Sequence, residues 1–290
     1  MLLNMKDLLK IANENYFAIP AFNVSDYSMF MGIMESCEKT DSPVIIEIHP
    51  LELDFTGTDL VDAIIKRAYK SPVPVCLHLD HCNDYKKIIY AIQAGFTSVM
   101  FDGSDLPFEE NIKGAQKIVE ISHPANVSVE AELGTIGSTD GQAEAGAEQI
   151  IYTNPADAAE FVERTKVDTL AVAIGTSHGL YPAGMTPKLR LDILKEIKAK
   201  VGVPLVLHGG SNNSDEEIAE AVKIGINKIN ISSDIKVAYY EKMREVLKDE
   251  SLREPNIIQP SCIAAMQKVV EHKLELFRTT GKAALYGRRS

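Results

Sequence analysis

The sequence contains no tryptophan, only four cysteines among its 290 residues, and no long hydrophobic run. The four cysteines, Cys37, Cys76, Cys82 and Cys262, are widely scattered and form no CxxC pair. Such spacing favours free thiols in a reducing compartment over a disulfide framework. No segment approaches the ~18 apolar residues of a membrane span, and the N-terminus lacks the basic and apolar regions of a signal peptide. We therefore expect a cytoplasmic protein.

Positive charge is also scarce. The chain has 30 Lys and Arg residues against 41 Asp and Glu residues, a formal net charge of -11 without any block of like charges. Nucleic acids and anionic membrane surfaces attract clusters of Lys and Arg, so neither is an expected partner. A small anionic substrate is compatible with this balance, because a few local hydrogen-bond donors can override the net charge.

What remains is the composition of a globular protein, with 45% hydrophobic and 24% charged residues. Eight short β-rich runs recur along the chain, and segments with helical periodicity lie between them. The runs are AIPAFNV from residue 18, PVIIEI from 43, PVCLHLD from 74, TSVMFD from 97, NVSVEAE from 126, DTLAVAIG from 168, VPLVLH from 203 and INKINI from 226. Helical periodicity marks residues 27–39, 59–69, 84–94, 108–121, 155–165 and 214–223. This alternation predicts one α/β domain over residues 1–290, a (β/α)8 TIM barrel with a C-terminal helical tail over 251–290.

In such a barrel the catalytic groups lie at the C-terminal ends of the strands. Polar residues occupy every predicted strand end, namely Asn23, His49, Asp80-His81, Asp102, Glu132, His178, His208 and the segment 230–234. One histidine alone is more often a structural residue that makes a hydrogen bond. Three neutral imidazoles that converge on an open position are the usual ligands of a catalytic zinc ion. His81, His178 and His208 therefore predict a zinc site.

Acidic residues accompany these histidines. Asp80 either acts as a base beside the metal or orients an imidazole. Asp102 and Glu132 end neighbouring strands, and they either hold a second metal ion or are satisfied by backbone amides and basic side chains. Because adjacent residues of a strand point to opposite sides, Asp80 and His81 can both serve the site only if the chain bends. We expect that bend to place Cys82-Asn83 in a turn.

Two short motifs predict a phosphate site. HGGS at 208–211 and NISSD at 230–234 follow the seventh and eighth predicted strands. Barrels of this fold commonly bind phosphate at this place, where glycine amides and short hydroxyl side chains surround the anion at a helix N-terminus.

Together these motifs resemble the class II, zinc-dependent ketose-bisphosphate aldolases, which include fructose- and tagatose-bisphosphate aldolases. The resemblance covers nearly the whole chain in order, through AFNV, SPVII, LHLDH, SVMFDGS, VSVEAELG, YTNPADAAEFV, LAVAIGTSHGLY, VPLVLHGGS and KINISSDIK. It implies cleavage of a ketose 1,6-bisphosphate to dihydroxyacetone phosphate and glyceraldehyde 3-phosphate, with fructose 1,6-bisphosphate slightly favoured over tagatose 1,6-bisphosphate. It also implies a homodimer or homotetramer.

Matched residue by residue, the resemblance makes His81, His178 and His208 the zinc ligands and Asp80 the residue that transfers a proton. A second divalent ion or a monovalent cation is a further expectation, with Asp102 and Glu132 as its candidate ligands. The expected substrate contacts are Asn23, Gly179, Gly209, Gly210, Ser211, Asn230, Ile231, Ser232 and Ser233.

Several positions depart from the family pattern. The lid after AELG reads GSTD where the family has Gly-Gly-x-Glu, so Asp140 takes the place of the acid that protonates C3, with Glu144 as the alternative. His49 stands where a small residue usually faces the phosphate, and Asn212 stands where glycine usually follows HGGS. The segment NISSD at 230–234 replaces the Asn-x-Asp-Thr, Asn-x-Asn-Thr or Asn-x-Ala-Thr patterns of the main subgroups. We expect intact core chemistry and an altered substrate end.

Two other functions stay open. A Schiff-base aldolase needs a desolvated lysine, for which Lys228 is the candidate, although a buried ion pair with Glu130 is the simpler interpretation of that residue. Alternatively, the barrel binds phosphate and metal without turnover.

Overall fold

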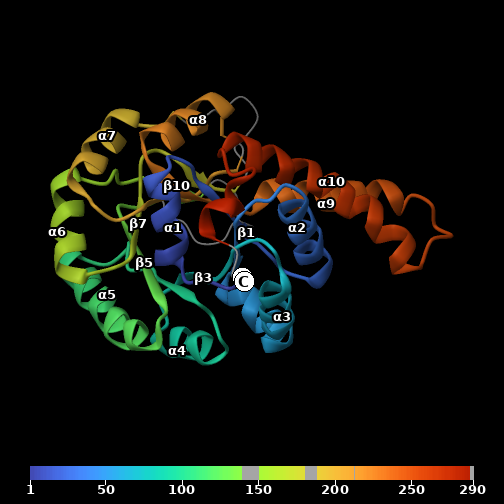
Figure 1. Ribbon diagram of the computed structural model, residues 1–290, viewed down its shortest axis with the longest axis horizontal. Helices are drawn as coiled ribbons and strands as arrows, with labels where there is room; N and C mark the ends of the chain where they lie inside the picture. The colour runs from blue at the N-terminus through green and yellow to red at the C-terminus, as the bar shows by residue number, and fades with distance from the viewer. Residues whose placement is uncertain (139–149, 180–187, 212, 288–290) are drawn as a thin grey trace.

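The computed structural model describes residues 1–138, 150–179, 188–211 and 213–287. Within these residues, eight parallel strands close into a barrel, in the order β1-β10-β9-β7-β5-β4-β3-β2 (Figure 1). The strands are β1 (Ile19–Asn23), β2 (Val44–Ile48), β3 (Val75–Cys82), β4 (Ser98–Phe101), β5 (Ser128–Leu133), β7 (Thr169–Val172), β9 (Leu205–Leu207) and β10 (Ile226–Ile231). Each strand coincides with one of the eight predicted runs, although β3 and β5 continue past the ends of their runs to Cys82 and Leu133, so the predicted (β/α)8 barrel is confirmed.

Helices surround this barrel (Figure 1). They are α2 (Tyr27–Lys39), α3 (Pro50–Lys70), α4 (Tyr85–Gln93), α5 (Phe108–Ser122), α6 (Pro155–Thr165), α7 (Leu191–Lys200) and α8 (Asp215–Ile224). Short 3-10 helices lie at His123–Ala125 and Lys282–Tyr286. No helix in the described part of the chain is both long and apolar enough to cross a membrane.

The third helix differs from its prediction, because α3 begins at Pro50 and not at residue 59. The His49 side chain accepts a hydrogen bond from the backbone N–H of Leu51, and the Glu52 side chain reaches back to the His49 N–H, which forms a capping box. Proline fits the first helical position because its missing N–H would have no partner there. Gly57, at φ 65°, then interrupts the helix and breaks the periodicity that the sequence offers.

A helix that the sequence analysis did not identify, α1 (Met5–Glu14), closes the N-terminal end of the barrel. Its apolar residues Met5, Leu8 and Leu9 are fully buried in one cluster with Ile19 and Ile45 near the starts of β1 and β2. In Figure 1 this helix lies across the middle of the ring. The opposite, C-terminal end of the strands is therefore the end available for a substrate.

The C-terminal part of the chain forms two long helices, α9 (Ser233–Val246) and α10 (Pro255–Leu276), that pack on each other. They extend beyond the barrel at the right of Figure 1. The helical tail predicted over residues 251–290 is confirmed, and α10 is the main helix within it. A Cβ atom on Gly32 of α2 would come within 2.8 Å of Ile263 and Met266, so α10 packs closely against α2 at this glycine.

The barrel interior contains a layer of buried charge. The Nζ atom of Lys228 lies 3.0 Å from Glu130 Oε1 and 3.4 Å from Glu47 Oε2, and all three side chains are fully buried. The predicted ion pair with Glu130 is thus confirmed, and Glu47 is an unforeseen second partner. Although burial lowers it, the two carboxylates raise the pKa of Lys228 above its ordinary value. The buried His78 contacts Ser98 Oγ through Nδ1 at 2.9 Å.

We expect Lys228→Met to lower the free energy of unfolding by about 3–5 kcal/mol, because it leaves buried carboxylates without their counter-ion. Urea denaturation measures this change. The matched control is Lys223→Met, because the exposed Lys223 pairs with Glu220 on the surface of α8. That control should change the stability by less than about 1 kcal/mol. Equal stabilities of the two variants would contradict the prediction.

Candidate active site at the C-terminal end of the barrel

Asp80 and His81 reach the same site because β3 contains a bulge. The backbone of His81 has φ 42°, and the register with β4 shifts between Leu79 and Cys82, where β3 has one residue more than its partner. A bulge changes the direction of a side chain without ending the strand. The predicted bend is therefore confirmed, but its predicted position in a turn at Cys82-Asn83 is wrong, since Cys82 is still paired in β3.

The three predicted histidines lie together. The ring centroid of His81 is 4.8 Å from that of His178 and 4.4 Å from that of His208. One ring nitrogen of each lies within 4.8 Å of the others. His208 directly follows β9. His178 lies beyond β7, in β8 (Ser177–His178), which pairs with β6 (Gly137–Ser138) outside the barrel.

Carboxylates orient two of these imidazoles. Asp102 Oδ2 lies 2.8 Å from His81 Nδ1. Glu130 Oε1 lies 2.8 Å from His208 Nε2, and Glu132 Oε2 lies 3.0 Å from His208 Nδ1. His81 Nε2 is buried and has no hydrogen-bond partner among the described residues. For His81, the carboxylate that holds Nδ1 fixes the ring and leaves Nε2 for a metal ion, which is the usual arrangement around zinc. Both ring nitrogens of His208 contact carboxylates.

The charge state of the cluster also suits a cation. Burial lowers the pKa of His178 well below its ordinary value, so this imidazole is neutral and can act as a ligand. Burial opposes charge on His81 and His208 as well, yet the carboxylates beside them raise their pKa values to about 9 and about 10. These rings therefore hold protons that a dication would replace, since metal binding releases ligand protons. Burial raises the pKa of Glu132.

The donor set fits a zinc ion. Three imidazoles in reach of one another, with an orphaned buried nitrogen on His81, match a site with three protein ligands and an open position. His81, Asp102 and Glu132 form a second group whose ligand atoms lie within 4.8 Å of one another. The structure thus brings together the residues that the sequence analysis named for a second cation.

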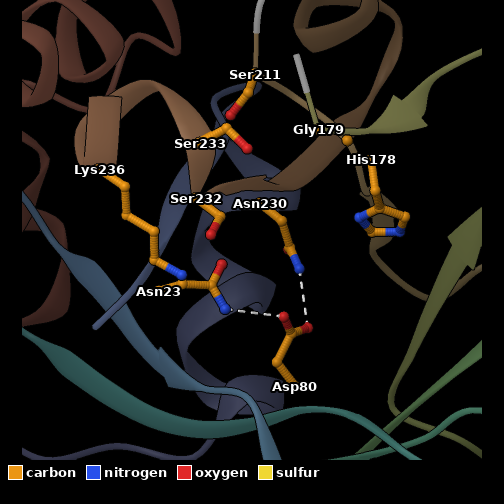
Figure 2. Close-up of a pocket in the computed structure, with 10 residues that line it drawn as sticks. Asn23, Asp80, His178, Gly179, Ser211, Asn230, Ser232, Ser233 and Lys236 are labelled. Atoms are coloured by element: carbon orange, nitrogen blue, oxygen red, sulfur yellow. Dashed lines mark hydrogen bonds between the residues drawn. The ribbon is translucent and has the colours of Figure 1, made fainter. Parts of the chain in front are cut away.

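Asp80 lies beside this cluster and is held by two amides (Figure 2). Asn23 Nδ2 and Asn230 Nδ2 each donate a hydrogen bond to one Asp80 oxygen at 3.0 Å. The residue is 1% exposed. Burial alone would raise its pKa, but the positive charges of His81 and Lys228 hold the pKa well below its usual range. Asp80 is therefore an ionised carboxylate in a fixed orientation.

One cavity connects Asp80 with the predicted phosphate motifs. Its lining residues are Asn23, Asp80, His178, Gly179, Gly209, Ser211, Asn230, Ser232, Ser233 and Lys236 (Figure 2). All of these except Lys236 were named from the sequence. Gly210 and Ile231, also named, do not line the cavity, because the Gly210 N–H is bonded to the Asn230 carbonyl and the Ile231 side chain is fully buried. Lys236 lies one helical turn after Ser232, and this spacing is the signal that could have found it.

The positions that depart from the family pattern have different places. The His49 side chain caps α3 and is absent from the cavity lining, so it does not replace the small residue that was expected to face the phosphate. Asp140, Glu144 and Asn212 lie outside the described residues.

Gly209 is a position where a side chain cannot be accommodated. Its φ is +62°, and a Cβ atom there would lie 2.5 Å from the Ser177 carbonyl oxygen. We expect Gly209→Ala to lower the free energy of unfolding by about 1–3 kcal/mol and to weaken substrate binding, because the loop must move away from the cavity. Thermal unfolding and KM measure both effects. Gly202→Ala is the control, since a Cβ atom there meets nothing within 4 Å; similar losses in both variants would contradict the expectation.

Comparisons with known proteins identify the family of this chain. The family model described as fructose-bisphosphate aldolase class-II matches residues 3–282. The chain is 37% identical over 283 residues to the D-tagatose-1,6-bisphosphate aldolase subunit GatY of Klebsiella oxytoca, covering 97% of this chain and 99% of that protein. It is 36% identical over 288 residues to a fructose-bisphosphate aldolase of Staphylococcus epidermidis, with the same coverage of 97% and 99%.

Solved structures give the same result. The YdjI aldolase of Escherichia coli K12 superposes with a TM-score of 0.85 at 34% identity, over 98% of this chain and 100% of that chain. A putative fructose-1,6-bisphosphate aldolase of Coccidioides immitis gives a TM-score of 0.87 at 29% identity, over 97% and 98% of the two chains. The chain belongs to the class-II fructose-bisphosphate aldolase family, and its family activity is that of a lyase.

Proposed function

We propose that the protein cleaves a ketose 1,6-bisphosphate reversibly to dihydroxyacetone phosphate and glyceraldehyde 3-phosphate, with fructose 1,6-bisphosphate as the favoured substrate and tagatose 1,6-bisphosphate as the second. The observation that carries this proposal is the cavity in which the ionised Asp80, His178 and the glycine- and serine-lined end lie together. A base, a metal ligand and an anion site within one cavity are what the cleavage of a phosphorylated ketose requires.

His81, His178 and His208 would hold one zinc ion in this proposal, and Asp102 and Glu132 would serve a second cation if one binds. The bound zinc ion would supply a Lewis acid for the negative charge that develops on the ketose half during cleavage. His208 would offer Nδ1 to the ion in place of its 3.0 Å contact with Glu132, while Glu130 holds Nε2 at 2.8 Å and fixes the ring.

Asp80 would accept the proton of the C4 hydroxyl group, after which the C3–C4 bond breaks. Its two hydrogen bonds from Asn23 and Asn230 hold both oxygens in place, so that the carboxylate does not have to reorient during the reaction. The cavity end with Gly179, Gly209 and Ser211 would bind the phosphate of the dihydroxyacetone half. Proton return to C3 is assigned to Asp140, with Glu144 as the alternative.

The proposed setting is cytoplasmic, and the proposed assembly is a homodimer or homotetramer, both on the basis of the family. The four cysteines support a reducing environment, because all of them are buried free thiols.

Release of triose phosphate from fructose and tagatose 1,6-bisphosphates, measured side by side, tests the proposal and the order of the substrates. Fructose 1,6-bisphosphate should give the higher kcat/KM. A reversed order would correct the substrate, whereas no release from either compound would favour a barrel that binds without turnover.

Borohydride treatment with substrate separates the metal-dependent reaction from a Schiff-base reaction. Lys228 is held as an ammonium ion between two carboxylates, and a protonated amine cannot attack a carbonyl. We therefore expect no covalent adduct by mass spectrometry. An adduct at Lys228 would contradict the proposed mechanism.

A further inference from the structure

Lys236 lies in the cavity although no sequence motif pointed to it. It is the one lysine or arginine among the described residues that line the cavity, and its side chain is 25% exposed. A phosphate group carries up to two negative charges. Amides and hydroxyls can donate hydrogen bonds to it, but they carry no positive charge that neutralises it. The position of Lys236 therefore raises the question of which anionic group it contacts.

Lys236 extends from α9 into the cavity, and Figure 2 draws its ammonium group toward Asn23 and Ser232. Long side chains on a helix lean back over the preceding turn, and the preceding turn here contains Ser232 and Ser233. The N–H of Asp234, in the first turn of this helix, donates to Ser211 Oγ at 3.3 Å. Figure 2 shows Lys236 and the three serines Ser211, Ser232 and Ser233 around the same cavity. The ammonium group of Lys236 and the start of α9 therefore line the same cavity, and both attract an anion.

A second set of contacts holds the lysine at this place. Its Nζ atom lies 2.7 Å from Glu52 Oε1, and Ser25 Oγ donates to the same oxygen at 2.5 Å. The other oxygen, Glu52 Oε2, accepts the capping-box hydrogen bond from the His49 N–H at 3.4 Å. His49 is therefore linked to the cavity indirectly, because its capping box helps to hold the carboxylate that pairs with Lys236. An ammonium group has three donors, so Lys236 can bind Glu52 and a phosphate at once.

We propose that Lys236 is a specificity-determining residue that contacts the phosphate bound at the Ser211–Ser232–Ser233 end of the cavity, and that Glu52 positions its ammonium group for this contact. The identity of that phosphate, as part of the dihydroxyacetone half of a ketose bisphosphate, rests on the proposed function. The contact itself does not, since inorganic phosphate offers the same chemistry.

Calorimetric titration with inorganic phosphate tests the contact in Lys236→Met, Lys236→Arg and Glu52→Gln. Loss of a charge-assisted hydrogen bond should raise the phosphate Kd of Lys236→Met by about tenfold or more, while Lys236→Arg should stay within about threefold. Glu52→Gln keeps an oxygen for the lysine but removes the competing negative charge, so its Kd should fall. Lys242→Met is the matched control on the same helix, because the half-buried Lys242 pairs with Glu245 and does not line the cavity, and its Kd should not change.

Opposite shifts in Lys236→Met and Glu52→Gln support the proposal. Equal weakening of phosphate binding in both variants would overturn the proposal, because the Lys236–Glu52 pair would then act only as a structural support. A phosphate Kd of Lys236→Met within about twofold of wild type would also overturn it. KM for fructose 1,6-bisphosphate should follow the phosphate Kd, with kcat less affected. A wild-type protein that binds phosphate through Lys236 but releases no triose phosphate would refute the proposed function and leave this inference supported.

Discussion

Replacement of Asp80 by asparagine is expected to lower kcat for bisphosphate cleavage by about 10³-fold, within the range that general-base catalysis contributes. The amide has nearly the same shape but cannot accept a proton. It also creates a donor–donor conflict, since both Asp80 oxygens accept N–H groups from Asn23 and Asn230. Steady-state release of triose phosphate measures the loss, and zinc content and the far-ultraviolet circular dichroism spectrum report whether the fold is retained.

The matched control is Asp168→Asn, because Asp168 is a buried acid that precedes β7, at the opposite end of the barrel. Its carboxylate accepts the Val129 N–H at 2.9 Å and pairs with His123 at 2.9 Å and with Lys6 at 3.3 Å. Its loss should lower stability and leave kcat within about twofold, since this carboxylate lies at the opposite end of the barrel from the cavity. If Asp80→Asn retained more than a tenth of wild-type kcat, Asp80 would not be the proton acceptor.

The barrel and most of the lining of its cavity could be predicted because they follow from local patterns. A buried parallel strand leaves a short apolar run, and a polar residue that ends such a run lies at the same barrel end as the other strand ends. That rule placed Asp80, His178 and Ser211 in one site without any structure. Ile231 was named only from the family resemblance, and its fully buried side chain is absent from the cavity lining, because neighbouring residues of a strand face opposite sides.

Features that depend on distant partners could not be predicted. A bend beside His81 was predicted, but its form as a bulge within β3 depends on the register with β4, which the β3 sequence does not record. Glu47 looked like an ordinary strand residue, and only the closed barrel brings it to Lys228. Lys236 follows the recognised motif by one turn, yet its contact with Glu52 joins α9 to α3, which are far apart in sequence. Tertiary contacts of this kind decide the substrate end of the site, while the catalytic residues follow from strand ends.

Removal of the metal is the second large expected effect. Treatment with EDTA should abolish cleavage and added zinc should restore it. The reason is that a Lewis acid lowers the activation barrier by several kcal/mol, and each 1.36 kcal/mol changes the rate by about tenfold. The same treatment should leave the fold intact, since the barrel core does not depend on the three histidines. Full activity of protein shown by elemental analysis to be metal-free would refute the mechanism.

A variant localises this effect to the three imidazoles. His178→Ala should bind clearly less than one zinc ion per chain and lose about 10³-fold or more in kcat, because two ligands cannot complete a site that needs three. His272→Ala is the control, since His272 lies on α10 with a 51% exposed side chain and pairs with Asp215 at 2.9 Å. It should keep the zinc content and activity of the wild type.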